Sequence, residues 1–568
     1  MRKFSETNSS TAIQSAIFLF LYVALVTTVT AVLSATKLTN FHLPIPHIAA
    51  AVVVIFAYRR KWNVVAISLT IFCAALAMAN LFDDVYFDGV TYHASGIVWS
   101  STDFSLWRPV VDDFWNLFVN HYPKASWLWG ASFLGPIGNL TFAKSLNWVF
   151  LGASGLVAYQ CFRNLNRSTR ILAALAISFN PIVCNQLFTN YVDGLMGSLL
   201  VTALVTSGRL IQLRYKGEMT KQLGVALIFS LIYMPGLKFT GLLFSGAIVV
   251  ANLVAYSFLY SNANRLSERL RSGISTALFN LKVFWKQAVS ALLFAIFLLW
   301  NPYITNLSLG LNPLHPAFGD KKLSTLISGQ TTQEFYDLQP AHRLFLSLFA
   351  KSSELMPTTT PAVPTVKMPF QADLAQIQMF AGVDTRIGGW GPLMSGILLT
   401  ALLMLLMHFW NLRALSEFSL LSIPFVVVAI TLLNPESWWA RFSPQVATLP
   451  ILVVWMLMNT EFPGSPKKQM LKYLGTAILT LSLINTALTT IPMVMNVANA
   501  NSYLTAQTDT FKSWDPQGRV TWNKHSFNLE TIFARRGISW RKVTNDSFDG
   551  NYCADLFNER VCSGTVDK

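Results

Sequence analysis

The sequence predicts an all-α polytopic membrane protein, and three observations lead to this fold class. Of its 568 residues, 53% are hydrophobic and 12% are charged, which leaves too little polar surface for a water-soluble domain. Apolar runs as long as a membrane span recur along the chain, and basic residues gather in alternate turns between them. The formal net charge of +15 is therefore attributed to cytoplasmic loops, and no nucleic-acid partner is expected.

The first three apolar runs set the orientation of the chain. A run over about 12–34 follows two basic residues, and it is long enough to act as an anchor instead of a cleaved signal. Runs over about 44–58 and 64–82 follow, with the basic turn 59–61 between them. Because positive residues mark cytoplasmic turns, the N-terminus is predicted inside and the acidic stretch after residue 82 outside.

The same alternation continues to the end of the membrane module, 1–495. Basic turns at 163–170, 214–221 and 262–286 all fall on the cytoplasmic side. The later apolar runs lie near 140–162, 171–188, 194–213, 222–236, 239–260, 286–305, 391–410, 415–433, 444–459 and 471–493. The total is about thirteen spans, with the C-terminus outside.

Two long segments between spans are predicted outside. Segment 83–139 is too polar to span and rich in aromatic residues, which suggests helices lying at the membrane surface. Its aromatic residues include Phe104, Trp107, Phe114, Trp115, Phe118, Tyr122, Trp127 and Trp129. Segment 306–390 has a Pro/Thr-rich middle, 356–364, which resists helix formation and is either a mobile lid or a plain connector.

The polar tail, 496–568, predicts a small periplasmic domain. The spacing of Cys553 and Cys562 permits a disulfide in an oxidising compartment. Three tryptophans are available for its core: Trp514, Trp522 and Trp540. The remaining cysteines lie in apolar runs, where they are expected to pack as small hydrophobic residues: Cys73, Cys161 and Cys184.

Metal and nucleotide chemistry have no visible motif in this chain. No zinc-ligand spacing, phosphate-binding glycine loop or dinucleotide fingerprint is found. His93, His121 and His315 are scattered in outer segments without the spacing of metal ligands. No metal site is predicted, and whether the reaction needs a divalent metal is left open.

The stretch 81–93 concentrates three carboxylates, two tyrosines and a histidine just beyond an apolar run. If the segment is helical, Asp84 and Asp88 share one face, and each disfavours the ionised form of the other. One of them then suits a general base near neutral pH. The alternative is that the acids only cap a helix where it leaves the membrane.

Further charged residues fall on the same predicted side. Asp193 stands at the start of a span, where a carboxylate also stabilises the helix end, and Lys238 follows a Pro-Gly break. Glu436 and Arg441 share a short outer turn, where they could simply pair with each other. Together these acids and cations suit a reaction between a lipid-linked anionic donor and an exported acceptor.

Several short segments resemble the GT-C membrane glycosyltransferases, in particular bacterial relatives of the dolichyl-phosphate-mannose-dependent protein mannosyltransferases of family 39. The run Asp88-Gly89-Val90-Thr91-Tyr92-His93 is similar to the family pattern Asp-Ser-Leu-Thr-Tyr-His, with Gly89 in place of a bulkier residue. Other similar segments are 121–124, 191–193, 238–241, 301–303, 384–392 and 438–442. The chain departs from the family in having two more spans before Asp83 and no Asp-Glu pair at this place.

The resemblance implies a GT-C-like fold and an inverting transfer of sugar from a polyprenyl-phosphate carrier to an exported glycan, lipid or protein. The reaction is placed at the outer face of the bacterial inner membrane, and no cofactor besides the donor lipid is expected. Asp88, or Asp84 nearer the membrane, is expected to act as the base. The donor phosphate is assigned to Arg441, Arg386 and Lys238, and further substrate contacts to Asp193, Tyr92, His93 and Glu436.

Two other functions fit part of the pattern. An O-antigen polymerase or ligase also has many spans and a large outer loop, but it is expected to depend on residues such as Arg343 or His342. A lipid or sugar transporter is the non-enzymatic alternative. Transporters place ionisable residues near the midplane, whereas the charged residues here gather at the outer ends of the spans.

Overall fold

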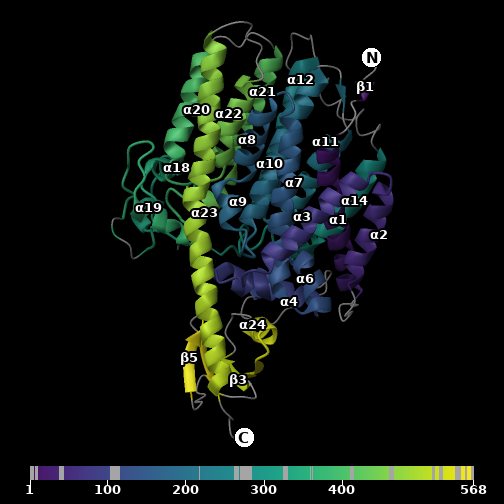
Figure 1. The fold of residues 1–568 in the computed structure, drawn as a ribbon, viewed down its shortest axis with the longest axis vertical. Helices are drawn as coiled ribbons and strands as arrows, with labels where there is room; N and C mark the ends of the chain where they lie inside the picture. The colour runs from purple at the N-terminus through teal and green to yellow at the C-terminus, as the bar shows by residue number, and fades with distance from the viewer. Residues whose placement is uncertain are drawn as a thin grey trace.

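The fold was obtained as a computed structural model of the whole chain. It describes residues 1–568 except 1–4, 7–9, 37–43, 103–115, 216–217, 220, 261–267, 269–284, 324–329, 358–359, 361, 410–414, 459–465, 515–518, 524–528, 544–551, 557–558 and 564–568. A body of long helices carries a lobe on one flank and a small domain at one end (Figure 1). The prediction of a mainly helical chain, with helices long and apolar enough to cross a membrane, is confirmed.

The first part of the chain forms three long helices and then a group of short ones. Its elements are α1 (Thr11–Ala35), α2 (Ile45–Tyr58), α3 (Trp62–Ala79), η1 (Gly89–His93), α4 (Ala94–Ser101), α5 (Asn116–His121), α6 (Ala125–Ile137), η2 (Leu140–Lys144) and α7 (Ser145–Cys161). Trp127 and Trp129 of α6 are fully buried against neighbouring helices. These two rings therefore face the protein interior, the placement of helices over 83–139 at a membrane surface stays a prediction, and the aromatic residues between 103 and 115 lie outside the described residues.

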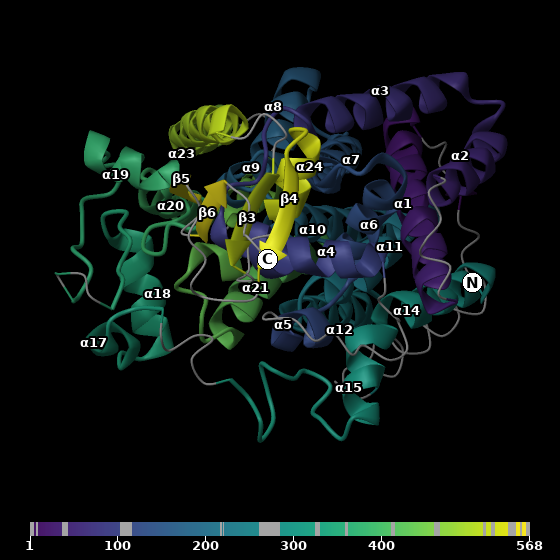
Figure 2. The same ribbon diagram turned by 90° about the horizontal axis from the view of Figure 1, so that it is seen from below.

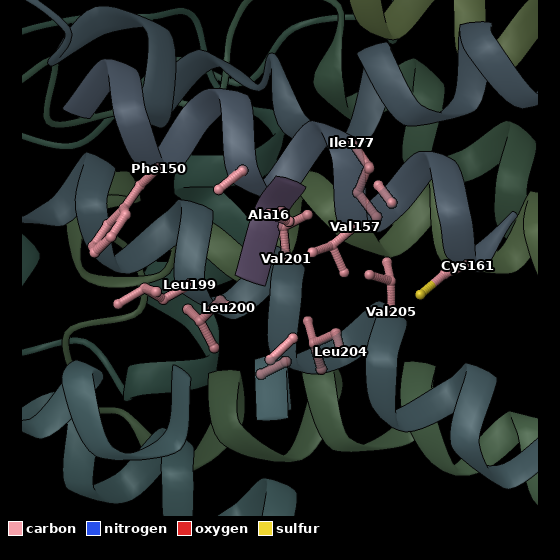
Figure 3. Packing of buried hydrophobic residues seen from close by; sticks show 14 of the residues in the cluster. Ala16, Phe150, Val157, Cys161, Ile177, Leu199, Leu200, Val201, Leu204 and Val205 are labelled. Atoms are coloured by element: carbon pink, nitrogen blue, oxygen red, sulfur yellow. The ribbon is translucent and has the colours of Figure 1, made fainter. Parts of the chain in front are cut away.

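The middle of the chain contributes the central helices. They are α8 (Arg167–Ser178), α9 (Pro181–Asn185), α10 (Asp193–Tyr215), α11 (Lys221–Leu237), α12 (Thr240–Tyr260), α14 (Trp285–Leu299), η3 (Trp300–Ile304) and α15 (Thr305–Ser308). The predicted span 171–188 is not one helix, because Pro181 cannot donate a backbone hydrogen bond and Asn180 caps a new helix by accepting from the Val183 N–H. Figure 3 shows side chains of α10 packed among those of α1, α7 and α8 in the core.

The lobe and the remaining helices follow. The lobe contains α17 (Gln333–Tyr336), α18 (Pro340–Phe349), α19 (Leu374–Gln378) and η4 (Met379–Ala381). The helices after it are α20 (Met394–Phe409), α21 (Leu415–Leu433), η5 (Ala440–Phe442), η6 (Pro444–Thr448), α22 (Leu449–Met458) and α23 (Pro466–Trp514). The predicted module boundary at 495/496 falls within α23, which has 49 residues and runs on into the small domain.

Five helical stretches of the described residues are long and apolar enough to cross a membrane. They are Thr11–Ala35, Trp62–Ala79, Asp193–Leu213, Val289–Ser308 and Gln469–Ser513, and six shorter apolar helices accompany them. The total of thirteen spans stays a prediction. Among the cysteines expected as packing residues, Cys161 and Cys184 are buried and Cys73 is exposed.

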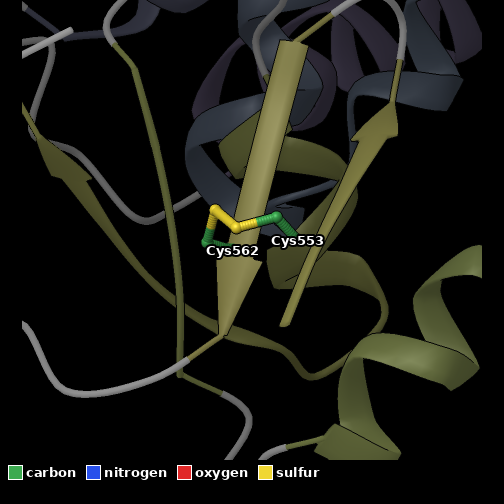
Figure 4. Close-up of a disulfide and its surroundings, with 2 residues drawn as sticks. All are labelled: Cys553 and Cys562. Atoms are coloured by element: carbon green, nitrogen blue, oxygen red, sulfur yellow. A yellow bond between two sulfur atoms is a disulfide. The ribbon is translucent and has the colours of Figure 1, made fainter. Parts of the chain in front are cut away.

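The small domain is a four-stranded sheet with one helix. It consists of β3 (Arg519–Asn523), α24 (Leu529–Arg535), β4 (Ser539–Val543), β5 (Tyr552–Leu556) and β6 (Glu559–Ser563), in the order β4-β3-β6-β5. A disulfide joins Cys553 and Cys562 across β5 and β6 (Figure 4). The side chains of the three tryptophans predicted for its core lie outside the described residues, and Leu504 and Phe511 of α23 belong to the described core.

The small domain is tied to the acidic stretch after α3. Arg535 and Arg536 contact the two carboxylate oxygens of Asp83 at 2.6 and 3.0 Å. The side chain of Asn501 in α23 accepts from the Asp83 N–H and donates to the Asp83 carbonyl. Figures 1 and 2 show this domain at the end of the helical body beside α4 and α6, whereas the short β1 (Ser5–Glu6) and β2 (Glu218–Met219) pair at the opposite end.

Candidate active site

Arg441 is the centre of the candidate site because its guanidinium meets three carboxylates from distant parts of the chain. Its Nη2 lies 2.8 Å from Asp88 Oδ2, and its Nη1 lies 2.6 Å from Asp384 Oδ2. Its Nε lies 3.2 Å from Asp193 Oδ2 without forming a hydrogen bond. Such a planar fork suits several carboxylates at once, and it joins η5 to three other segments at the same end of the helical body.

Lys238 provides the second cation of this cluster. It lies between α11 and α12, and its Nζ is 2.5 Å from Asp193 Oδ1. The pair is buried, and the Phe442 ring covers the ammonium group at 4.0 Å. Gln186 supports the pair by donating to Asp193 Oδ2 and accepting from the Gly194 N–H. Asp193 is thus held between two cations at the first residue of α10.

Asp384 belongs to the cluster although it was not predicted as a site residue. Its second oxygen accepts a hydrogen bond of 2.7 Å from Trp439 Nε1. Burial raises the pKa of Asp384 to about 6, although Arg441 acts in the opposite direction. The only signal in the sequence was its place at the start of the family-like segment 384–392.

Asp88 is one of the two more accessible carboxylates of the cluster. Its side chain is 20% exposed and that of Asp384 is 26% exposed, against 3% for Asp193. The Asp88 N–H donates to the Tyr191 hydroxyl, which fixes the start of the helical turn that carries it. Among the described residues, Asp88 Oδ1 has no hydrogen-bond donor, so this oxygen is free to accept a proton.

Asp84 occupies a different environment from Asp88. It precedes the helical turn, so the two acids do not share a helix face. Its carboxylate accepts hydrogen bonds from the backbone N–H groups of Asn190 at 2.6 Å and Tyr86 at 3.0 Å. Burial raises its pKa to about 6. A small cavity beside it is also lined by Lys144 and by Arg535 of the small domain.

Gly89 is required by this position of Asp84. A Cβ atom on Gly89 would lie 2.0 Å from Asp84 Oδ2. A glycine at this position therefore has a steric reason: the carboxylate of Asp84 fills the space that a side chain would take.

Tyr92 and His93 follow Asp88 but are enclosed by aromatic rings. His93 Nδ1 accepts a hydrogen bond of 2.9 Å from Trp127 Nε1, and Tyr92 stacks on Phe118 at 5.0 Å. Burial lowers the pKa of His93 to about 4, so the imidazole is neutral near pH 7. No group of three or more His, Cys, Asp or Glu side chains within the described ranges is placed to hold a metal ion.

Arg386 and Glu436 lie next to the cluster without joining its ion pairs. Arg386 donates to the Gln330 carbonyl and lies 5.1 Å from the Trp439 ring. Glu436 accepts from Trp438 Nε1 at 2.7 Å and faces Arg343 at 3.7 Å. The alternative in which Glu436 simply pairs with Arg441 is therefore wrong, because Arg441 contacts the three aspartates.

The charges of the cluster leave a negative excess. Asp88, Asp193 and Asp384 carry three negative charges when ionised, and Lys238 and Arg441 carry two positive ones. A proton taken up by one of the two accessible carboxylates would bring the cluster to neutrality. This arrangement can therefore accept a proton from a bound hydroxyl group while its cations stay in place.

Comparison of the chain with protein-family models, with curated proteins and with solved structures finds no match in any of the three.

Proposed function

We propose that this protein is an inverting membrane glycosyltransferase that moves a sugar from a polyprenyl-phosphate carrier to an exported acceptor. The observation that carries the proposal is the cluster of Asp88, Asp193, Lys238, Asp384 and Arg441. It joins a proton acceptor to two cations, the buried Lys238 and the largely enclosed Arg441, at one end of a body of apolar helices. A lipid-linked anionic donor needs both features where the lipid meets water.

In this reaction Asp88 removes the proton from the acceptor hydroxyl. The acceptor oxygen attacks the anomeric carbon, and the bond from that carbon to the phosphate oxygen breaks as the new glycosidic bond forms. The carrier leaves as a polyprenyl phosphate, which takes the electron pair of the broken bond. Arg441 holds the Asp88 carboxylate through one oxygen and leaves the other for the proton.

Positive charge for the leaving phosphate comes from Lys238, Arg441 and Arg386. An arriving phosphate adds negative charge to a cluster that already has an excess of one. Donor binding therefore favours protonation of Asp384, whose pKa is already raised to about 6 by burial. With Asp384 neutral, Arg441 gains hydrogen-bonding capacity for the phosphate.

Asp84 acts as a positioning residue in this account. Its carboxylate joins the stretch before Asp88 to the backbone at Asn190, next to Tyr191, whose hydroxyl accepts from the Asp88 N–H. Tyr92, His93, Asp193 and Glu436 are buried, so we assign them to the support of the site and not to direct contact with sugar or acceptor. The acceptor class, whether glycan, lipid or protein, is left open, and the reaction is placed at the outer face of the bacterial inner membrane.

The test of this function is the identity of the lipid that co-purifies with the protein. The protein is extracted in mild detergent, and bound lipids are identified by mass, with the Lys238→Met variant as a comparison. We expect a polyprenyl-phosphate sugar that is depleted in the variant. Transport of a lipid or sugar into vesicles with no new glycosidic bond would replace the proposal with the transporter alternative.

A further inference from the structure

The lobe between α15 and α20 exposes an unusually apolar surface. Six large apolar side chains at the end of α18 and in the segment 363–374 are each at least 41% exposed, with Met368 at 74% and Leu374 at 68%. We call this surface the apolar flank, and it consists of Phe345, Val363, Val366, Met368, Phe370 and Leu374. An exposed group of large apolar residues of this kind normally marks a contact with another molecule or with a membrane.

Backbone hydrogen bonds join the end of α18, which carries Phe345, to the segment 363–374, which carries the other residues of the apolar flank. The Lys367 N–H donates to the Phe349 carbonyl, and the Lys351 N–H donates to the Thr365 carbonyl, both at 2.8 Å. Phe349 in turn stacks on Phe345. The end of α18 and the segment 363–374 therefore present their exposed side chains from one connected structure.

The apolar flank is fixed against the beginning of α20. The buried ammonium group of Lys367 donates to the Pro392 carbonyl at 2.7 Å, two residues before α20 begins. The Phe370 ring lies so close to Gly396 that a Cβ atom there would meet it at 2.4 Å. Phe370 has a φ of 63°, a conformation that side chains other than glycine rarely adopt, so packing holds it there.

Beyond its buried or half-buried first turns, 394–401, α20 exposes apolar side chains. Leu402, Leu403, Leu406 and Met407 of α20 are all exposed, as expected of a helix that faces lipid. Figure 1 shows α18 and α19 beside α20 and α23, on the flank of the helical body and not beyond its end. The lobe is therefore attached where α20 begins.

We infer that the apolar flank inserts into the outer leaflet of the bilayer and anchors the lobe in the membrane. Lipid is the occupant that the surroundings favour, because the flank is fixed at the start of α20, a helix whose later turns expose Leu402, Leu403 and Leu406. The exposed ion pair of Lys351 and Asp373, 3.6 Å apart, stands next to the apolar side chains and suits the headgroup region. This inference does not depend on the proposed reaction.

Nitroxide labels in nanodiscs test the insertion directly. Labels are placed on single cysteines introduced as Met368→Cys and Leu374→Cys, with Glu334→Cys as the control at an exposed charged position in the same lobe. The parent protein carries Cys73→Ser, since Cys73 is an exposed thiol, whereas Cys161 and Cys184 are buried. Power saturation then compares collisions with oxygen, which concentrates in lipid, and with a water-soluble nickel chelate.

The inference predicts a higher ratio of oxygen to nickel collisions at 368 and 374 than at 334. Equal access of the nickel chelate to all three positions would overturn it, because the surface would then face water. Protection of 368 and 374 from both reagents would also overturn it, since another protein surface, such as a second copy of this chain, would then cover the flank. Thermal unfolding of each labelled protein checks that the lobe is folded.

Discussion

Replacing Arg441 with methionine tests the cluster as a structural unit. The substitution leaves Asp88, Asp193 and Asp384 with Lys238 as their only cation, so the negative excess of the cluster rises from one to two. Removing one partner of a buried ion pair costs about 3–5 kcal/mol. Because Asp88 and Asp384 are partly exposed, we expect a value near the lower end, about 3 kcal/mol.

The stability lost in Arg441→Met should also depend on pH. Without Arg441 the three carboxylates repel one another, which raises their pKa values in the folded protein above those in the unfolded chain. The folded state then binds more protons than the unfolded state, so the deficit of the variant shrinks as the pH falls from about 8 to about 5. Unfolding in mixed micelles with increasing dodecyl sulfate is followed by circular dichroism at each pH. It gives the free energy of unfolding of the variant and the change of this free energy with pH.

Arg343→Met is the matched control for this experiment. The Arg343 side chain is 5% exposed against 13% for Arg441, but it faces a single carboxylate at 3.7 Å without a hydrogen bond. We expect Arg343→Met to lose less unfolding free energy than Arg441→Met, with a weaker dependence on pH. Equal losses in the two variants, or a deficit in Arg441→Met that is the same at both pH values, would refute the electrostatic account of the cluster.

Three further predictions concern the surroundings of the cluster. Gly89→Ala should destabilise the protein by about 1–3 kcal/mol, because the new Cβ displaces the Asp84 carboxylate. Gly224 lies in a helix with open space around it, so Gly224→Ala should be neutral or stabilising in the same unfolding assay. Burial raises the pKa of Glu354 from 4.5 to about 7, so this residue should contribute a fall in stability on the order of 3 kcal/mol as the pH rises through that window. Glu354→Gln should remove this contribution, so that the variant loses less stability than the wild type between pH values on either side of the window. Asp83→Asn should release the small domain by removing the charge that two arginines share, and hydrogen exchange in α24 should rise while exchange in α10 stays unchanged.

The helices were largely predictable because hydropathy is a local property. Apolar runs located α1, α3 and α10 to within a few residues. The break before α9 also has a local cause in Pro181. The extension of α23 beyond residue 495 was missed because hydropathy falls there while the segment 496–514 contains neither glycine nor proline to end the helix.

The site was predictable as a set of residues but not as a network. Alternating basic turns grouped Asp88, Asp193, Lys238 and Arg441 on one side, and the structure brings their side chains together at one end of the helical body. The individual pairings depend on tertiary packing, which sequence spacing does not reveal. Asp384 was missed for this reason, since only the fold brings it to within 2.6 Å of Arg441.

The separation of Asp84 from Asp88 has the same origin. Four residues of spacing suggested a shared helix face, but the chain becomes helical only after Asp84. One carboxylate thus binds backbone N–H groups near residue 190, and the other binds Arg441. The sequence left open which of the two acids is the base. In the structure the two acids can be distinguished by their surroundings, because Asp84 binds backbone N–H groups and Asp88 binds Arg441.

The rate of sugar transfer by Asp88→Asn protein in nanodiscs tests the central claim most directly. The donor is a labelled polyprenyl-phosphate sugar, and Asp84→Asn and the exposed Asp320→Asn serve as comparisons. Loss of a general base lowers a rate by about 10²- to 10⁴-fold, which we expect for Asp88→Asn, with a smaller loss for Asp84→Asn and none for Asp320→Asn. Transfer by folded Asp88→Asn protein at the wild-type rate would contradict the account.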